Sequence, residues 1–145
     1  MAEQLYYEDV DEGMEIPPIE KVATSRALVM YCAAYEDFAE IHHDKDAAQR
    51  VGFPNTIVPG LFTSAYLAQM LTDWITPEGN IKKLQASYRR PHFAGDKVIC
   101  KGLVTARRIE GNEHLVECEV WAENSQGEAS TPGIAVLTLP SRTTH

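Results

Sequence analysis

Asp37 and His42 are the two residues whose types and spacing best suit chemistry. Four residues separate them, and they follow a stretch that predicts a helix. A carboxylate and an imidazole held around one water molecule can take a proton from it and deliver one elsewhere, and imidazole titrates near neutral pH. We therefore predict an acid/base pair. The spacing alone leaves another interpretation open, in which Asp37 lies in solvent and His42 is a hydrogen-bonded core histidine.

A metal site is a third interpretation, because His43 and Asp44 directly follow His42. Adjacent side chains rarely converge on one ion, and known sites space their ligands along the chain. We expect no metal here.

Gly60 marks a second place where chemistry is expected, because the segment 57–61 enters an apolar helical stretch. The free N–H groups and the positive dipole end of a helix N-terminus favour negative charge, and glycine allows a close approach to the backbone. A thioester carbonyl placed there would have its developing negative charge stabilised. Simple entry into a helix remains the alternative.

Three helices are predicted to position these residues. The first spans 27–35, with Ser25 as a plausible N-cap, and a short second one spans 47–51, with Asp44 as its cap. The third and longest begins at Pro59-Gly60 and ends near Ile75. Its apolar residues cover most of the circumference, which predicts a buried helix.

The remaining segments predict strands over 19–23, 84–88, 97–108, 114–123 and 134–139. Residues 114–123 alternate, with 116, 118, 120 and 122 on one face. Short glycine-containing turns after 108 and 123 favour an antiparallel meander. The predicted fold class is α+β, with an antiparallel sheet wrapped around one long central helix.

Composition narrows the class of protein. A chain of 145 residues predicts a single domain over 1–145, and a net charge of -8 disfavours nucleic acid as a partner. Three widely spaced cysteines are expected to be buried thiols in a reducing compartment. The polar segment 1–10 is not expected to be a signal peptide, and glycines and prolines interrupt the charge-free stretch 51–72. We expect a cytoplasmic protein that does not interact with membranes.

Several of these segments together resemble one family, the MaoC-like hydratases and dehydratases. The resemblance covers nearly the whole chain, and the matching motifs are Asp37-x4-His42-x-Asp44, Gly52-Phe53, Ile57-x-x-Gly60 and Tyr88-x-x-Pro91-x-Phe93-x-Gly95-Asp96.

This resemblance implies the hot-dog fold and the interconversion of trans-2-enoyl and 3-hydroxyacyl thioesters of coenzyme A or an acyl carrier. It implies that Asp37 and His42 are catalytic and that the Gly60 N–H binds the thioester oxygen. It further implies that no metal or redox cofactor takes part, acyl-coenzyme A being the substrate. The expected assembly is a homodimer or a heteromer with a second MaoC-like chain.

The chain departs from the family pattern around these residues. Tyr35-Glu36 replaces the usual Ser-Gly, and Pro59 replaces the histidine before the glycine. Tyr35, His43 and Ser64 are therefore candidate residues of an altered substrate pocket. The Asp-Phe-x-x-Ile-His-His-Asp version is similar to a subgroup that acts on bulky, steroid-type thioesters as a heteromeric complex.

Two other functions stay open. Hot-dog proteins include acyl-thioesterases, but these normally use a carboxylate on the central helix, and 60–72 contains none. The chain could also be a non-catalytic subunit, although an intact Asp37/His42 pair argues against that.

Overall fold

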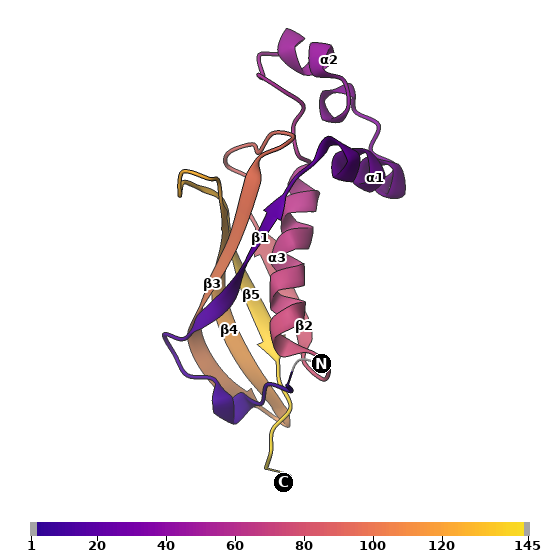
Figure 1. Ribbon diagram of the computed structural model, residues 1–145. Helices are drawn as coiled ribbons and strands as arrows, with labels where there is room; N and C mark the ends of the chain where they lie inside the picture. Colours follow the sequence, from indigo (N-terminus) through magenta and orange to yellow (C-terminus); the bar gives the residue numbers. More distant parts are fainter. Residues whose placement is uncertain (1–2, 144–145) are drawn as a thin grey trace.

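Five antiparallel strands form one sheet in the computed structural model, which describes residues 3–143 (Figure 1). The strands are β1 (Glu15–Val22), β2 (Asn80–Ala86), β3 (Lys97–Glu110), β4 (Glu113–Glu123) and β5 (Ala129–Thr138), in the order β1-β3-β4-β5-β2. Antiparallel pairing of β3 with β4 and of β4 with β5 confirms the predicted meander. In β4 the side chains at 116, 118, 120 and 122, which are predicted to share one face, are all buried.

The central helix α3 (Gly60–Ile75) lies along one face of this sheet and contacts β1, β2, β3 and β4 (Figure 1). Its buried side is a stripe of large side chains that includes Tyr66, Leu67, Met70 and Leu71. The predicted burial around the whole helix is wrong for the single chain, because the sheet covers one side only. Leu61, on the opposite side, is 44% exposed.

A long segment between β1 and α3 extends beyond the end of the sheet (Figure 1). It contains α1 (Ser25–Tyr35), the 3-10 turn η2 (Glu40–His42) and α2 (Lys45–Arg50). Asp44 caps α2 as predicted, since its carboxylate accepts from the N–H groups of Asp46 and Ala47. For α1 the predicted cap is wrong by one residue: Thr24 is the N-cap, and its hydroxyl accepts from Ala27 N.

The first and last strands begin earlier than predicted, at Glu15 and Ala129. Prolines explain both differences. In a sequence, proline predicts the end of a strand, but a folded strand tolerates it where the sheet needs no hydrogen bond from that backbone N–H. Pro17-Pro18 lies in β1, an edge strand, whose register with β3 shifts between Ile16 and Ile19. In β5 the carbonyl of Pro132 still accepts from Ser87 N at 2.9 Å.

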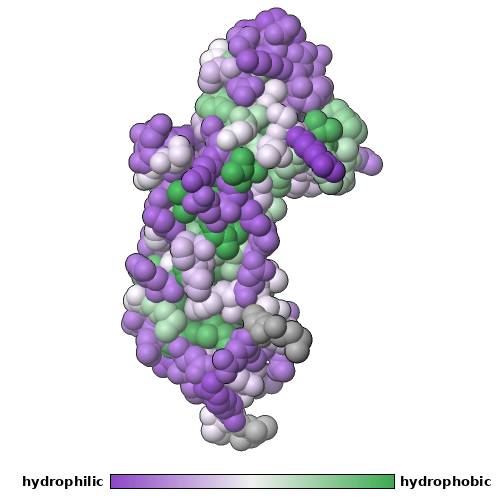
Figure 2. All heavy atoms as spheres, in the orientation of Figure 1, coloured by the Kyte–Doolittle hydropathy of each residue, from purple (hydrophilic) through white to green (hydrophobic). Residues whose placement is uncertain are grey.

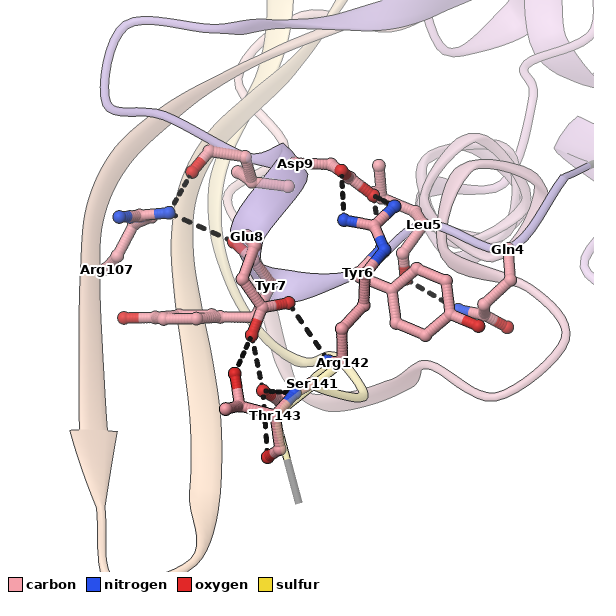
Figure 3. Close-up of polar contacts among 11 residues, drawn as sticks. Gln4, Leu5, Tyr6, Tyr7, Glu8, Asp9, Arg107, Ser141, Arg142 and Thr143 are labelled. Atoms are coloured by element: carbon pink, nitrogen blue, oxygen red, sulfur yellow. Dashed lines mark hydrogen bonds and ion pairs between the residues drawn. The ribbon is translucent and has the colours of Figure 1, made fainter. Parts of the chain in front are cut away.

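The two ends of the described chain are joined at the far end of the sheet (Figure 3). The carboxylate of Asp9, in the turn η1 (Tyr7–Asp9), accepts two hydrogen bonds from the Arg142 guanidinium, at 2.6 and 2.9 Å. Glu8 accepts from the hydroxyl of Ser141 and from Arg142 N. These hydrogen bonds lower the pKa of Glu8 to about 2.

Cys32, Cys100 and Cys118 are free and buried, as predicted. Burial raises the pKa of both Cys100 and Cys118 to about 12, so neither thiol ionises at neutral pH. Within residues 3–143, no helix is long and apolar enough to cross a membrane.

Candidate active site

Asp37 and His42 face one another within the segment that joins β1 to α3. Oδ2 of Asp37 lies 3.5 Å from Nε2 of His42, and their side chains are 33% and 12% exposed. The chain turns sharply between α1 and Asp37 because Glu36, the C-cap of α1, adopts a left-handed conformation (φ 61°). Asp37 N then donates to Cys32 O at 2.9 Å, which fixes where the carboxylate projects.

A backbone carbonyl determines the tautomer of His42. Nδ1 of His42 lies 2.8 Å from the oxygen of Ile57. Because a carbonyl can only accept, Nδ1 carries a proton, and in the neutral imidazole Nε2 therefore presents its lone pair toward Asp37. Two acceptors do not bond to each other, but a water molecule donating to both would satisfy them. A carboxylate and an imidazole placed in this way can hold one water molecule between them, as acid/base chemistry requires.

The N-terminus of α3 supplies hydrogen-bond donors close to this pair. The N–H groups of Phe62 and Thr63 both donate to Pro59 O. Those of Gly60 and Leu61, also in the first turn, have no acceptor among the hydrogen bonds of the described chain. Gly60 is also tightly packed, since a Cβ added there would lie 2.8 Å from Cγ of Tyr88.

A pocket of about 260 Å³ connects His42 with this helix end. Its walls come from η2 (His42), the start of α3 (Gly60 and Thr63) and the segment Tyr88–His92. Asp37 does not line the pocket and reaches it through His42. The arrangement places an acid/base group and a helix N-terminus on the same small volume, which suits acyl-group chemistry with developing oxyanion charge.

The other predicted pocket residues lie farther out. Ser64 does not line the pocket, but its hydroxyl bonds to that of Tyr88 at 2.6 Å, and Tyr88 does line it. His43 is exposed. Tyr35 is 57% exposed and stacks on Tyr31. The predicted roles of these three residues in a substrate pocket stay predictions.

Sequence reasoning missed several lining residues, namely Thr63, Arg89, Arg90, His92 and Thr131. Arg89 and Arg90 carried a signal, since this basic pair occupies the two variable positions of the Tyr88-x-x-Pro91 motif. His92 carried none, because only its tertiary contacts distinguish it from an ordinary strand residue. It is 2% exposed, and burial lowers its pKa against the opposing influence of Asp96.

No group of three or more potential metal ligands occurs within residues 3–143.

The sequence comparisons with known proteins agree on the kind of protein that this chain resembles. The family model described as "MaoC like domain" matches residues 11–125. The "3-oxo-4,17-pregnadiene-20-carboxyl-CoA hydratase beta subunit" of Mycobacterium tuberculosis is 29% identical over 119 residues, which are 82% of this chain and 89% of that protein.

Solved structures agree on the fold. A chain of the ChsH1-ChsH2 complex from Mycobacterium tuberculosis superposes with a TM-score of 0.79 and 26% identity, covering 89% of this chain and 98% of that chain. The (R)-hydratase from A. caviae involved in PHA biosynthesis superposes with a TM-score of 0.83 and 22% identity, covering 92% and 99%. These matches confirm the predicted hot-dog fold, an antiparallel sheet around one central helix.

Proposed function

This chain belongs to the MaoC-like domain family, and from that premise we propose that it interconverts trans-2-enoyl and 3-hydroxyacyl thioesters by adding or removing water. The observation that carries the proposal is the arrangement of His42 and Asp37. In the neutral imidazole, Nε2 of His42 is the unprotonated nitrogen, and it lies 3.5 Å from Asp37 Oδ2, so the two side chains can share one water molecule.

In the hydration direction, the pair takes one proton from the water as its oxygen forms a bond to C3 of the enoyl group. The electron pair of the C2–C3 double bond moves toward the thioester, and negative charge develops on the carbonyl oxygen. The Gly60 N–H and the α3 dipole stabilise that charge. The pair then returns one proton to C2, so that one water molecule is added in total.

Coenzyme A is the proposed carrier, because the 29% identical relative is named as a hydratase of a coenzyme A thioester. The acyl group of that relative is steroid-type, which supports the bulky-substrate subgroup suggested by the Phe38 motif. Hydration involves no redox change, and the Asp37/His42 pair supplies the proton transfers, so the proposal includes neither a redox cofactor nor a metal.

A second MaoC-like chain, identical or different, is the proposed partner. Large apolar side chains are exposed on α1 and just after it, notably Val29, Met30 and Phe38, the last at 68%. Figure 2 shows apolar atoms around α1, whereas the neighbouring end that carries α2 is mostly hydrophilic. Such a surface favours a protein contact. The same proposal treats residues 1–145 as one cytoplasmic domain that binds neither nucleic acid nor membrane.

The thioesterase alternative has no observation in its favour, because the only carboxylate of α3 is Asp73, near the end opposite Gly60. The alternative of a non-catalytic subunit gains some support from the relative's designation as a beta subunit. The close approach of Asp37 to His42 argues against it.

The proposal is tested on a panel of short, long and polycyclic trans-2-enoyl-coenzyme A thioesters. Loss of enoyl absorbance measures the hydration of each one. Free thiol is measured in the same reactions. We expect enoyl loss without thiol release for at least one substrate. Thiol release instead would establish a thioesterase, and inactivity of the chain on every substrate, alone and with a second MaoC-like chain, would refute the proposal. Native mass spectrometry of the isolated chain reports whether it pairs with itself.

A further inference from the structure

A buried histidine that lines the pocket, and a buried serine bonded to it, take no part in the proposed chemistry. His92 and Ser130 are 2% and 1% exposed, and Nε2 of His92 lies 2.5 Å from Oγ of Ser130. The Ser130 hydroxyl donates to Ala122 O at 3.1 Å, so its oxygen accepts from His92 Nε2–H. Burial lowers the pKa of His92, which favours the neutral ring. Its Nδ1 has no hydrogen-bond partner within residues 3–143.

This pair attaches one wall of the pocket to the sheet. Ser130 lies in β5, and its carbonyl accepts from Arg89 N at 3.0 Å and from Arg90 N at 3.2 Å. Its side chain holds His92. The wall segment Tyr88–His92 is therefore fixed by the backbone and the side chain of one strand residue.

The same wall holds the segment that precedes α3. Val58 N donates to His92 O at 2.8 Å, and Ala94 N donates to Thr56 O at 2.9 Å. Ile57 and Phe93 form an antiparallel bridge between these two bonds. Segments 56–58 and 92–94 are thus a short two-stranded ladder.

The backbone N–H and carbonyl of Ile57 take no part in this ladder and instead form hydrogen bonds with η2. Its N–H donates to Ile41 O at 2.9 Å, and its carbonyl accepts from His42 Nδ1 at 2.8 Å. A continuous series of hydrogen bonds therefore runs from Ser130 through the His92 side chain and backbone, across the ladder, to the imidazole of His42.

We propose that His92 is a positioning residue, which acts with Ser130 to place the Ile57 carbonyl and thereby fixes the tautomer and orientation of His42. This inference rests on the proposed acid/base role of His42. Stability alone does not explain the pair, because a buried nitrogen without a partner is destabilising and two aliphatic side chains would fill the same volume without it. A hydrogen bond between buried groups instead specifies one geometry.

The experiment compares three variants. His92→Leu removes the ring nitrogens, His92→Gln keeps an N–H donor near the position of Nε2, and Ser130→Ala removes the acceptor. We expect His92→Leu and Ser130→Ala to lower kcat roughly 10- to 100-fold, since a misplacement of about 1 Å costs on the order of 10²-fold. KM should stay within about 3-fold, because both changes act on the reaction through the orientation of His42. The Gln variant should recover most of kcat.

The double variant, His92→Leu with Ser130→Ala, should be no slower than the slower single variant, because both changes break the same series of contacts. Ser141→Ala is the matched control, since it removes a serine hydrogen bond at the far end of the sheet. It should leave kcat unchanged. Thermal melts establish that each variant is folded.

The tautomer of His42 gives a readout that does not depend on activity. Long-range proton–nitrogen NMR of the imidazole rings should show His42 as the Nδ1–H form in the wild type and in His92→Gln, and as a mixture in His92→Leu. A single Nδ1–H tautomer with wild-type kcat in His92→Leu would overturn the inference, as would equal losses in the Leu and Gln variants. Retained activity in Asp37→Asn and His42→Ala would instead refute the proposed function.

Discussion

The carbonyl oxygen of Ile57 accepts a hydrogen bond from Nδ1 of His42 at 2.8 Å, although 15 positions separate the two residues. Ile57 N also donates to Ile41 O, so the same residue holds η2 by both of its backbone groups. The imidazole is therefore oriented before any substrate binds. Such preorganisation is what an acid/base group requires for efficient proton transfer.

Loss of either dyad member should abolish most activity. We expect Asp37→Asn and His42→Ala each to lower kcat by about 10²–10⁴-fold, because each removes one of the two groups proposed to hold and deprotonate the water. The double variant should be little worse than the single ones, since the pair acts as a unit. Initial rates of enoyl loss at saturating substrate measure this.

Asp46→Asn is the control for the dyad variants, because Asp46 is exposed and lies in α2. Its kcat should equal that of the wild type. Wild-type activity in both dyad variants would contradict the assignment.

Gly60 should not tolerate a side chain. A Cβ at this position would lie 2.8 Å from Cγ of Tyr88, the atom of the ring closest to the backbone, so the ring must move. We expect Gly60→Ala to lower kcat/KM by at least about 10-fold. The loss should not exceed the effect of removing one oxyanion-hole donor. The helix itself should not suffer, because alanine is a better helix former than glycine.

Adding Tyr88→Ala to Gly60→Ala separates a steric cause of the activity loss from an electronic one. If the clash with the ring is responsible, the double variant should recover activity relative to Gly60→Ala. Tyr88→Phe alone reports the contribution of the hydroxyl bond to Ser64. Undiminished activity in Gly60→Ala would show that substrate does not approach this helix end.

Local sequence patterns predicted most of the elements that place the dyad. The Asp44 cap, the start of the central helix at Gly60 and the alternation in 114–123 all depend on neighbouring residues, and each is confirmed. Burial around all of α3 was predicted wrongly, because periodicity shows how much of a helix is apolar and not how much of it one sheet can cover.

The contacts that orient the dyad could not be predicted from the sequence. His92 and Ser130 are 38 positions apart, and nothing in either segment indicates that they meet. The same holds for Ser64 and Tyr88, which are 24 positions apart. These pairings follow from the sheet register and from the path of the extended segment, which short-range patterns do not specify.

The contact between the chain ends should contribute stability that acid removes. Hydrogen bonds from Ser141, Arg142 and Thr143 lower the pKa of Glu8 from 4.5 to about 2. A group with a depressed folded-state pKa stabilises the fold above its unfolded pKa, and that stability is lost as pH falls from about 4.5 toward 2. Urea unfolding should therefore show Glu8→Gln less stable than the wild type at pH 7 and nearly equal to it near pH 2.

Glu12→Gln is the matched control, because Glu12 is exposed and makes none of these contacts. It should show no such pH-dependent difference. An equal destabilisation by Glu8→Gln at pH 7 and pH 2 would indicate that lost packing, and not the ionised carboxylate, is responsible.

His92 should make stability fall at mildly acidic pH. Burial lowers its pKa below the usual 6.5, while Asp96 acts in the opposite direction. The unfolded chain therefore binds a proton at a higher pH than the folded chain does, and the free energy of unfolding rises with pH between the two values. This contribution is fully present above about pH 6.5 and is lost as pH falls toward the folded-state pKa of His92.

Because glutamine does not titrate, the stability difference between the wild type and His92→Gln should shift in favour of the variant as pH falls below 6.5. All other residues are the same in both proteins, so their contributions cancel in that difference. Urea unfolding at several pH values between 5 and 8 measures it. A pH-independent difference would mean that the protonated His92 ring finds an acceptor in the fold, contrary to the unpartnered Nδ1.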